Sequence, residues 1–501
     1  MTPHKAKGVI CVLTSAVLYV LVFPNFNFSF LAWVAFIPLV FSIQSQSSKQ
    51  AFLYGWLSGT LAYMGILYWI IPTFHAAQVS LGLAFAALLA LSAYVGLFWG
   101  AWAYFGVKIQ HQKFRFDLEP WSPLFGAAAW VALEYLRTFL FSGFPWTLLG
   151  DSQISHLALI QMASVTGVYG VSFLVVMVNL TFCVALKRTP KKRALLVPLL
   201  ILTGAYLFGQ SQLTQQFHKD DGKQLKVALL QGNIDQYKKW NEAYIEEIKQ
   251  TYSILVQRAS AAQVDLIIWP ETSVPGYLTQ DPALWIWLTG VIIKSHTSHL
   301  LGAPSAEGSK AFNAAFSISR FGLIQGSYAK QHLVPFGEIV PFQNLLGQWI
   351  PVLNALGGFN AGTVSPVLSA AGIPVGINIC YEAIFPDLVR RSVKAGGQAI
   401  VNITNDGWYM KTAAPYQHLA PNIFRAIENR RWVLRADNTG VSALIDPTGH
   451  IIAQTPIYQA RLLTGTIYAR TEQTFYTKYG DLFSWICLAI VSAWVFCRRT
   501  L

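Results

Sequence analysis

Charged side chains are scarce in this chain. They make up 12% of its 501 residues, and 54% of the residues are hydrophobic. Soluble globular domains carry roughly 25% charged residues. The composition excludes a disordered chain, which combines high charge with low hydrophobicity. It also argues against a single soluble globule, and it indicates an integral membrane protein with room for two or more domains.

Cysteine is equally rare, with five residues in the whole sequence. So few cysteines exclude a fold held together by disulfide bonds. Four of them fall within or at the end of long apolar runs, at Cys11, Cys183, Cys487 and Cys497. Cys380 lies instead in a more polar part of the chain, which makes it the cysteine to consider for chemistry.

Long apolar runs fill the first 210 residues. Most of them reach or approach the roughly 17–20 residues that cross a bilayer, and the second and the last are the shortest. The runs cover residues 8–23, 28–44, 51–72, 81–107, 121–141, 157–186, 194–210 and 483–497. The sequence therefore predicts a transmembrane bundle of seven helices over residues 1–210 and an eighth transmembrane helix at 483–497.

Lysine and arginine are absent from every second loop between these runs. The loops near 24–27, 73–80 and 142–156 hold none. The termini and the other loops hold thirteen, at Lys5, Lys7, Lys49, Lys108, Lys113, Arg115, Lys187, Arg188, Lys191, Lys192, Arg193, Arg498 and Arg499. Basic loop residues stay in the cytoplasm, so both termini are predicted inside and residues 211–481 outside. These loops account for most of the net charge of +13, and no basic groove pattern predicts a nucleic-acid partner.

Residues 223–474 have the pattern of an α/β domain. Short apolar segments that predict buried strands lie at Leu225–Leu230, Val264–Trp269, Ile373–Ile379 and Ala399–Ile403. Helix-period stretches separate them: one runs from Tyr244 to Leu255, and Asp281-Pro282 opens another with an N-cap and a first-turn proline. Alternation of strands and helices favours an α/β fold, here in an extracytoplasmic domain.

Three residues with reactive side chains stand at or near strand ends in this domain. Cys380 directly follows the third predicted strand, and Pro270 ends the second strand just before Glu271. Lys330 opens the segment Lys-Gln-His-Leu-Val-Pro-Phe-Gly-Glu. Taken singly, each has a structural explanation: a small buried cysteine, an exposed turn glutamate and a solvated lysine.

Together, Glu271, Lys330 and Cys380 resemble the Glu-Lys-Cys triad of the nitrilase, or carbon–nitrogen hydrolase, superfamily. The resemblance implies an α-β-β-α sandwich over residues 223–474. A thiol of pKa about 8.5 is mostly protonated at neutral pH, and a carboxylate can take its proton. An ammonium and backbone N–H groups can stabilise the resulting oxyanion. These residues indicate acyl transfer through a thioester without defining the acceptor.

The whole chain is similar to one membrane family, the apolipoprotein N-acyltransferases of the bacterial envelope. The further motifs that carry this similarity are Gln231-Gly232-Asn233 with Trp240, Gly143-Phe144-Pro145-Trp146 and Asn405-Asp406-Gly407-Trp408. The resemblance implies a multi-pass protein of the inner membrane with a periplasmic catalytic domain. It also implies a ping-pong reaction, in which a fatty acyl chain passes from a phospholipid, commonly phosphatidylethanolamine, through a thioacyl-enzyme to the N-terminal amine of a diacylglyceryl apolipoprotein.

The same resemblance implies roles for individual residues. Cys380 is the nucleophile, Glu271 the general base and Lys330 the oxyanion stabiliser. The supporting residues near the triad are Glu338, Tyr381 and Glu382. The residues implied in substrate binding are Trp240, Trp408, Asn405, Gly143 and Pro145, with the two tryptophans at the lipid entrance. No cofactor and no metal are implied, and a monomer is expected.

Two apolar segments and one charged pair leave alternatives open. Residues 342–356 predict either a mobile apolar lid at the lipid interface or a buried core helix, and residues 284–293 leave the same choice. Glu134 and Arg137 lie three residues apart on the fifth predicted span, so they share a helix face. They form either an ion pair within the bundle or a contact to a lipid headgroup.

Two other functions fit parts of the sequence. A membrane-anchored amidase or nitrilase would use the same triad with water as acceptor, although eight spans exceed what an anchor needs. A transporter with an outer domain would need polar groups along a path through the bundle, where Glu134 and Arg137 are almost the only ionic residues. The lipid-dependent acyltransferase is therefore the favoured hypothesis.

Overall fold

The computed structural model describes most of the chain. The described residues are 3–110, 122–186, 192–214, 222–236, 238–239, 241–340, 358–363 and 366–497. They form two compact units. The first comprises Met1–Gln215, Thr412–Ala420 and Tyr479–Leu501, and the second comprises Gln216–Lys411 and Pro421–Lys478.

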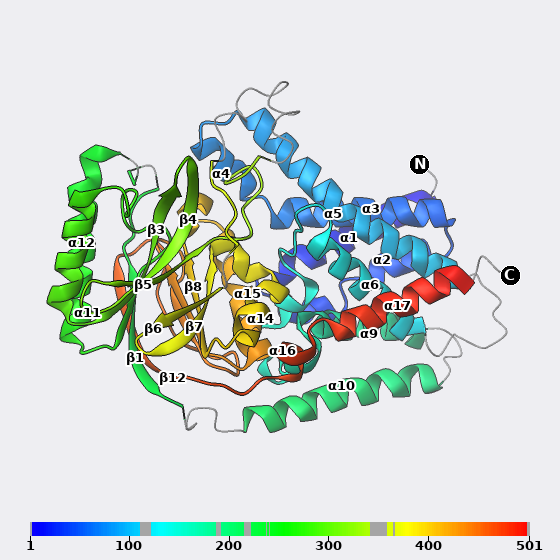
Figure 1. Cartoon of the computed structure of the whole chain (residues 1–501). Helices are drawn as coiled ribbons and strands as arrows, with labels where there is room; N and C mark the ends of the chain where they lie inside the picture. Colours follow the sequence, from blue (N-terminus) through cyan, green and yellow to red (C-terminus); the bar gives the residue numbers. More distant parts are fainter. Residues whose placement is uncertain are drawn as a thin grey trace. The chain divides into compact units, whose positions relative to one another are not determined.

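The first unit is helical (Figure 1). Its α-helices are α1 (Pro3–Val22), α2 (Ile37–Ile43), α3 (Ser48–Ile66), α4 (Ile70–Ala76), α5 (Leu81–Gln110), α6 (Ser122–Phe139), α7 (Leu157–Ile160), α8 (Ala163–Thr166), α9 (Val168–Ala185), α10 (Lys192–Leu213) and α17 (Leu482–Cys497). Short 3-10 helices lie at η1 (Ser29–Trp33) and η3 (Leu149–Gln153). Apolar residues dominate these helices, as the composition predicts for a membrane protein.

Among the described residues, three helices are long and apolar enough to cross a membrane by themselves. They lie in α5, α9 and α10. Helices α3 and α4, which meet at a bend of 49°, count as a fourth candidate if they form one span. Shorter apolar helices cover much of the other predicted runs, including α1 and α17. The structure thus has three or four candidate spans, and the number eight stays a prediction.

Two predicted runs are interrupted, for reasons that can be read from the backbone. The run 28–44 is divided between η1 and α2, because Pro38 occupies the first turn of α2, where a missing N–H is tolerated. The run 157–186 is divided between α7, α8 and α9. Gly167 separates the last two with φ of 66°, a conformation that favours glycine.

Gln417 satisfies four polar groups inside the first unit. Its side-chain oxygen accepts hydrogen bonds from the indole N–H groups of Trp69 (3.0 Å) and Trp146 (2.9 Å). Its side-chain nitrogen donates to the carbonyls of Ile66 (3.1 Å) and Pro24 (3.3 Å). The residue is buried, so these bonds replace hydrogen bonds to water that are not available there.

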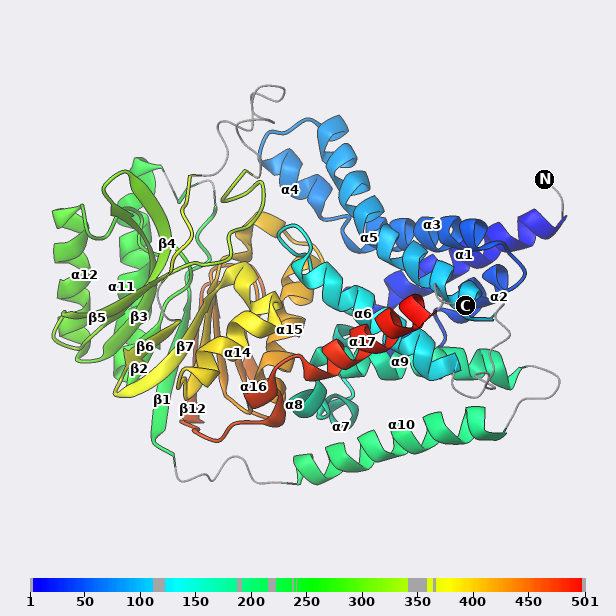
Figure 2. The same ribbon diagram turned by 45° about the vertical axis from the view of Figure 1, so that its right-hand side comes forward.

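The second unit is an α-β-β-α sandwich (Figures 1 and 2). One six-stranded sheet has the order β12-β1-β2-β3-β4-β5, and the other has the order β11-β10-β9-β8-β7-β6. The strands are β1 (Gln224–Gln231), β2 (Leu266–Ile268), β3 (Ser298–Glu307), β4 (Lys310–Ile318), β5 (Ile324–Ala329), β6 (Val367–Ala370), β7 (Ile373–Ile379), β8 (Ala399–Thr404), β9 (Val433–Asp437), β10 (Ala443–Ile445), β11 (Ile451–Gln454) and β12 (Arg461–Tyr468). The pairs β1–β2, β2–β3, β7–β8 and β8–β9 are parallel, so each sheet gathers several carboxyl ends at one edge.

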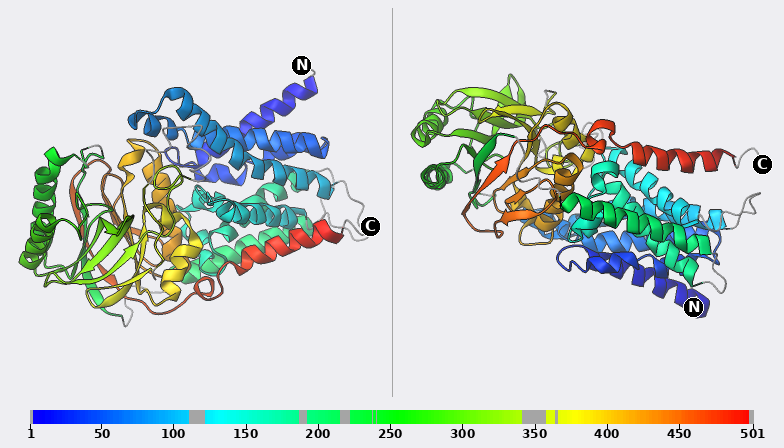
Figure 3. Two further views of the ribbon diagram at one scale, coloured as in Figure 1. Left: turned by 45° about the horizontal axis from the view of Figure 1, so that its top comes forward. Right: turned by 90° about the horizontal axis from the view of Figure 1, so that it is seen from below.

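Helices cover the outer faces of the two sheets. Helices α11 (Ile245–Ala261) and α12 (Pro282–Ser295) lie side by side on the first sheet (Figure 3). Asp281 caps α12 by accepting from the N–H groups of Ala283 and Leu284, as the sequence predicts. Leu284, Leu288 and Ile292 are buried against the sheet. The core-helix interpretation of 284–293 is therefore confirmed, and the lid interpretation of this segment is wrong.

The other helices of this unit belong to the second sheet. They are α14 (Pro386–Lys394), the part of α15 (Ala414–Asn429) after Pro421, and the short α16 (Phe475–Tyr479). A turn at residues 446–449 joins β10 and β11. There the Asp446 carboxylate accepts from the backbone N–H of Thr448 (2.8 Å) and of His450 (3.0 Å).

We predict that Gln417→Leu destabilises the first unit. The substitution removes the hydrogen bonds that this buried side chain makes to two indole N–H groups and two carbonyls, and each buried hydrogen bond lost costs about 1 kcal/mol. The unfolding temperature in detergent, followed by tryptophan fluorescence, should fall by about 5 °C or more. Gln210→Leu is the matched control, because Gln210 is exposed on α10. Equal unfolding temperatures for the two variants would contradict the prediction.

Candidate active site

Cys380 stands on a sharp turn at the carboxyl end of β7. Its φ is 53°, in the left-handed region that non-glycine residues adopt at a cost and that recurs at functional sites. The residue opens the 3-10 helix η6 (Cys380–Ile384) and is buried. The predicted nucleophile therefore lies where the parallel strands β7, β8 and β9 of the second sheet have their carboxyl ends.

Lys330 and the two predicted carboxylates form one buried cluster. The Lys330 ammonium lies 3.5 Å from Glu271 Oε1 and 2.8 Å from Glu338 Oε2. The side-chain amide of Asn313 donates to both carboxylates, to Glu271 at 2.6 Å and to Glu338 at 2.9 Å. Since Asn313 comes from the middle of β4, the first sheet itself sets the spacing of the cluster.

The Glu271 segment is fitted closely onto β3. A side chain at Gly302 would place a Cβ 2.6 Å from Pro270 O and 2.7 Å from Glu271 Cα. The backbone of Gly302 also exchanges hydrogen bonds with this segment, from Gly302 N–H to Pro270 O (3.2 Å) and from Ser273 N–H to Gly302 O (2.8 Å). Glycine at this position allows Glu271 to approach the sheet.

Charges in the cluster influence one another. Burial lowers the pKa of Lys330, but the carboxylates of Glu338 and Glu271 outweigh burial and raise that pKa well above its usual value. Against the effect of burial, Lys330 holds the pKa of Glu338 below its usual range. Burial and the Glu271 charge raise the pKa of the Cys380 thiol, while the Lys330 charge lowers it. A thiol of raised pKa stays protonated at neutral pH, so the nucleophilic role predicted for Cys380 would require a base.

Glu382 connects the Cys380 turn to the Lys330 segment. Its Oε1 accepts hydrogen bonds from the Tyr328 hydroxyl (2.8 Å) and from the backbone N–H groups of Gln331 (2.7 Å) and His332 (3.1 Å). Its Oε2 accepts from the backbone N–H of Ile379 (2.7 Å). Glu382 is fully buried, so it orients this part of the site. Tyr381 is also buried, with its ring 5.2 Å from that of Phe385.

The predicted substrate-binding residues have different environments. Asn405 is buried, and its Oδ1 accepts from Asn438 Nδ2 at 3.1 Å, whereas Trp408 is 45% exposed. Gly143 and Pro145 belong to the first unit, where Gly143 has φ of 78°. Trp240 and residues 342–356 lie outside the described residues.

Glu134 and Arg137 are both buried in α6. Glu134 Oε1 accepts from the backbone N–H of Leu149 at 2.8 Å. Arg137 donates to the Tyr63 hydroxyl and lies over the Tyr63 ring, with its guanidinium carbon 5.3 Å from the centroid. Both side chains thus link α6 to other parts of the helical unit.

Two residues of the site were missed by reasoning from sequence. Lys239 donates to the Glu271 carbonyl (3.0 Å) and to the Thr272 hydroxyl (2.5 Å). Burial lowers the pKa of this ammonium to about 8, against the attraction of Glu271. Asn313 is the other, and nothing in its strand pattern marks it as different from a core residue. Among the described residues, no three His, Cys, Asp or Glu side chains gather as a metal site requires.

Comparison with known proteins assigns the family. The apolipoprotein N-acyltransferase N-terminal domain matches residues 15–181, and the carbon-nitrogen hydrolase family matches residues 226–476. An apolipoprotein N-acyltransferase of Geobacter metallireducens is 38% identical over 97% of this chain and 95% of its own length. The chain belongs to the apolipoprotein N-acyltransferase family. A relative from Methylococcus capsulatus with the same name is 33% identical over 98% of this chain and 96% of its own.

The family and the candidate spans make this a multi-pass membrane protein with a nitrilase-superfamily catalytic domain. Among solved structures, a mutant amidase from Nesterenkonia sp. AN1 covers 52% of this chain and 95% of its own. The TM-score is 0.40 and the identity 20%. That structure carries the acetamide moiety of fluoroacetamide on its active-site cysteine.

We predict that Glu382→Gln destabilises the second unit. The amide keeps the shape of the carboxylate but turns an N–H₂ group toward hydrogen-bond donors, leaving at least one buried donor unpaired. The unfolding temperature should fall by about 5 °C or more. Glu307→Gln is the control, since Glu307 is exposed at the end of β3 and exposed substitutions of this kind change stability little. An unchanged unfolding temperature for Glu382→Gln would contradict a stabilising role for the Glu382 carboxylate.

Proposed function

We propose that the protein transfers a fatty acyl chain from a phospholipid such as phosphatidylethanolamine, through a thioester on Cys380, to the N-terminal amine of a diacylglyceryl apolipoprotein.

 The observation that carries this proposal is the cluster of Glu271, Lys330 and Cys380 at one edge of a nitrilase-type sandwich. Full-length similarity to named apolipoprotein N-acyltransferases supports it. Lipid donor and lipoprotein acceptor follow from that family.

The first half-reaction forms a thioester on Cys380. Glu271 takes the thiol proton while the sulfur attacks the ester carbonyl of the donor. The Lys330 ammonium and the Tyr381 N–H stabilise the tetrahedral oxyanion. The carbon–oxygen bond of the ester then breaks, and the proton on Glu271 passes to the leaving lysophospholipid oxygen.

The second half-reaction regenerates the thiol. The acceptor amine attacks the thioester carbonyl, and Glu271 removes a proton from the amine as the carbon–nitrogen bond forms. The carbon–sulfur bond breaks, and the sulfur regains a proton from Glu271. Donor and acceptor use the same site in turn, which makes the reaction ping-pong.

The membrane arrangement belongs to the same proposal. Eight transmembrane helices, seven in residues 1–210 and one at 483–497, place residues 223–474 in the periplasm and both termini in the cytoplasm. The distribution of basic loop residues supports this orientation. An exposed Trp408 is suited to contact lipid at the entrance, and Asn405 holds the Trp408 turn by accepting from the backbone N–H of Gly407. The family resemblance assigns Trp240, Gly143 and Pro145 to substrate binding as well.

The test is an acyl adduct on Cys380. Purified protein incubated with phosphatidylethanolamine should gain the mass of one fatty acyl chain, and hydroxylamine should remove it because it cleaves thioesters. Cys380→Ala should abolish both the adduct and transfer to a diacylglyceryl lipopeptide. Cys487→Ala is the control, since Cys487 lies in α17 of the first unit, whereas Glu271, Lys330 and Cys380 belong to the second unit.

Two results would contradict the proposal. Lipopeptide acylation by Cys380→Ala would exclude the thioester route. Steady release of free fatty acid or ammonia by the wild-type protein, independent of lipopeptide, would indicate a hydrolase with water as acceptor.

A further inference from the structure

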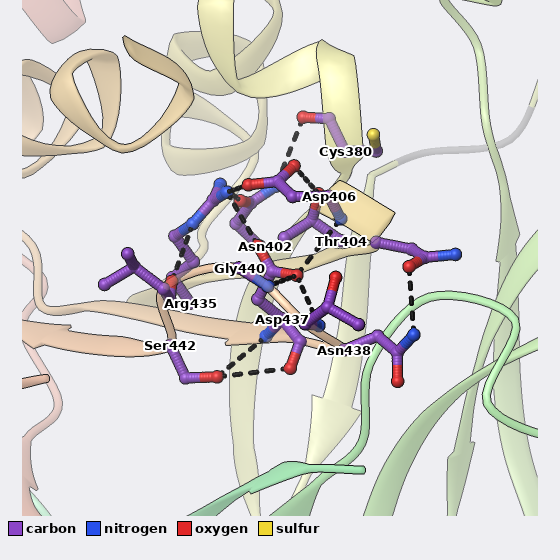
Figure 4. Close-up of polar contacts among 12 residues, drawn as sticks. Cys380, Asn402, Thr404, Asp406, Arg435, Asp437, Asn438, Gly440 and Ser442 are labelled. Atoms are coloured by element: carbon purple, nitrogen blue, oxygen red, sulfur yellow. Dashed lines mark hydrogen bonds and ion pairs between the residues drawn. The ribbon is translucent and has the colours of Figure 1, made fainter. Parts of the chain in front are cut away.

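A cluster of buried polar side chains lies beside Cys380, at the carboxyl ends of β8 and β9 (Figure 4). Arg435 Nη2 donates to the carboxylates of Asp406 (2.7 Å) and Asp437 (3.1 Å). Arg435 Nη1 donates to Asn402 Oδ1 at 2.6 Å. All four residues are fully buried. The mechanism above assigns no role to any of them, although two carboxylates share a single guanidinium close to the reactive sulfur.

Strand register places a hydroxyl between the sulfur and this cluster. Strands β7 and β8 pair with Ile379 opposite Ile403, so the next residues, Cys380 and Thr404, are neighbours at the two strand ends. Asp437 of β9 is the next member of this row of residues at the strand ends, because Thr404 pairs with Asp437. The topology of the sheet thus brings thiol, hydroxyl and carboxylate together from three separate segments.

Thr404 interacts with both the Cys380 thiol and the Asp406 carboxylate. Its Oγ1 lies 3.5 Å from Asp406 Oδ1. Burial raises the pKa of the Cys380 thiol, and a hydrogen bond with Thr404 lowers it. A hydroxyl carries one proton and can also accept. It can therefore accept from the S–H group while it points its proton at Asp406, or turn and donate that proton to a thiolate.

The carboxylates themselves are held in place. Asp437 Oδ1 accepts from the backbone N–H groups of Asp406 (3.1 Å), Thr439 (3.2 Å) and Gly440 (2.9 Å). A Cβ at Gly440 would lie 2.7 Å from Asp406 Oδ2, so the pair packs directly on that glycine. With both acids fixed by Arg435 and the backbone, the Thr404 hydroxyl is the group in this row that can rotate.

We propose that Thr404 is a positioning residue for Cys380, whose hydroxyl rotates from Asp406 toward the sulfur as the thiolate forms. The inference rests on the proposed function only in taking Cys380 as the nucleophile. In this step the thiol proton passes to Glu271 and the hydroxyl keeps its own proton, so no further acid or base is required.

The charged and titratable groups around the sulfur set the sign of the expected effects. They are Glu271, Lys330, Lys239, Asp406 and Tyr409. The Asp406 charge disfavours the thiolate, whereas the Thr404 bond favours it. Loss of the hydroxyl and loss of the Asp406 charge should therefore change the reactivity of the thiol in opposite directions.

The experiment measures alkylation of Cys380 by iodoacetamide against pH, in the full-length protein in detergent, by mass spectrometry of the Cys380 peptide. Thr404→Val keeps the shape of the side chain and removes the hydroxyl. Its midpoint should rise by about one pH unit, and below the midpoint its rate should fall about tenfold. Thr404→Ser should retain the wild-type profile, and Asp406→Asn should lower the midpoint.

Thr439→Val is the matched control. The Thr439 hydroxyl is buried next to the same cluster and has no hydrogen-bond partner among the described residues, so its loss should leave the profile unchanged. Thr404→Ala replaces Thr404→Val if the valine variant does not fold. A Thr404→Val profile that coincides with wild type, or an Asp406→Asn midpoint that rises, overturns the inference.

This readout is independent of the acyl-transfer assay. If Thr404→Val shifts alkylation but no acyl adduct forms on Cys380, the proposed function fails and the positioning role stands. If the adduct forms and the Thr404→Val alkylation profile does not move, the positioning role fails and the proposed function stands.

Discussion

The ammonium of Lys330 lies buried between two carboxylates, and the geometry of the site depends on this arrangement. Its side chain is 1% exposed and lies 3.5 Å from Glu271 and 2.8 Å from Glu338. A buried charge without a partner is strongly destabilising. Lys330 and Glu338 come from one segment and Glu271 from another, so the three can be buried together only when these two segments have assembled around Asn313.

Cys380 adds a second constraint, because its backbone conformation is costly. The surrounding contacts maintain the turn: Glu382 binds the backbone N–H of Ile379 on one side and those of the Lys330 segment on the other. Asn402 donates to the Cys380 carbonyl at 3.4 Å. The sulfur thus lies between Glu271 and Lys330 on one side and Thr404 and Asp406 on the other. Both sets of groups influence the pKa of the Cys380 thiol.

Local rules account for the parts of the fold that were predicted correctly. The strand Ile373–Ile379 has the predicted bounds, since a short apolar run with β-branched residues has one favourable way to be buried. The cap at Asp281 follows from a side chain that reaches its own helix. Bounds were less accurate where packing decides them. The strand expected at Val264–Trp269 is only Leu266–Ile268, and the apolar run 28–44 is divided between η1 and α2, which begins one residue before Pro38.

Composition, periodicity and motifs are local properties, so the membrane character, the α/β pattern of residues 223–474 and the candidate residues Glu271, Lys330 and Cys380 could all be named from the sequence. Which polar side chains surround those three residues depends on how distant segments pack in the folded domain. Lys239, Asn313, Thr404 and Arg435 are ordinary in sequence, and their importance comes from strand register and burial. Where water is excluded, a hydrogen bond or a charge a few ångströms away changes the pKa of a thiol. Such distances depend on the packing of segments that are far apart in sequence, so sequence patterns do not predict them.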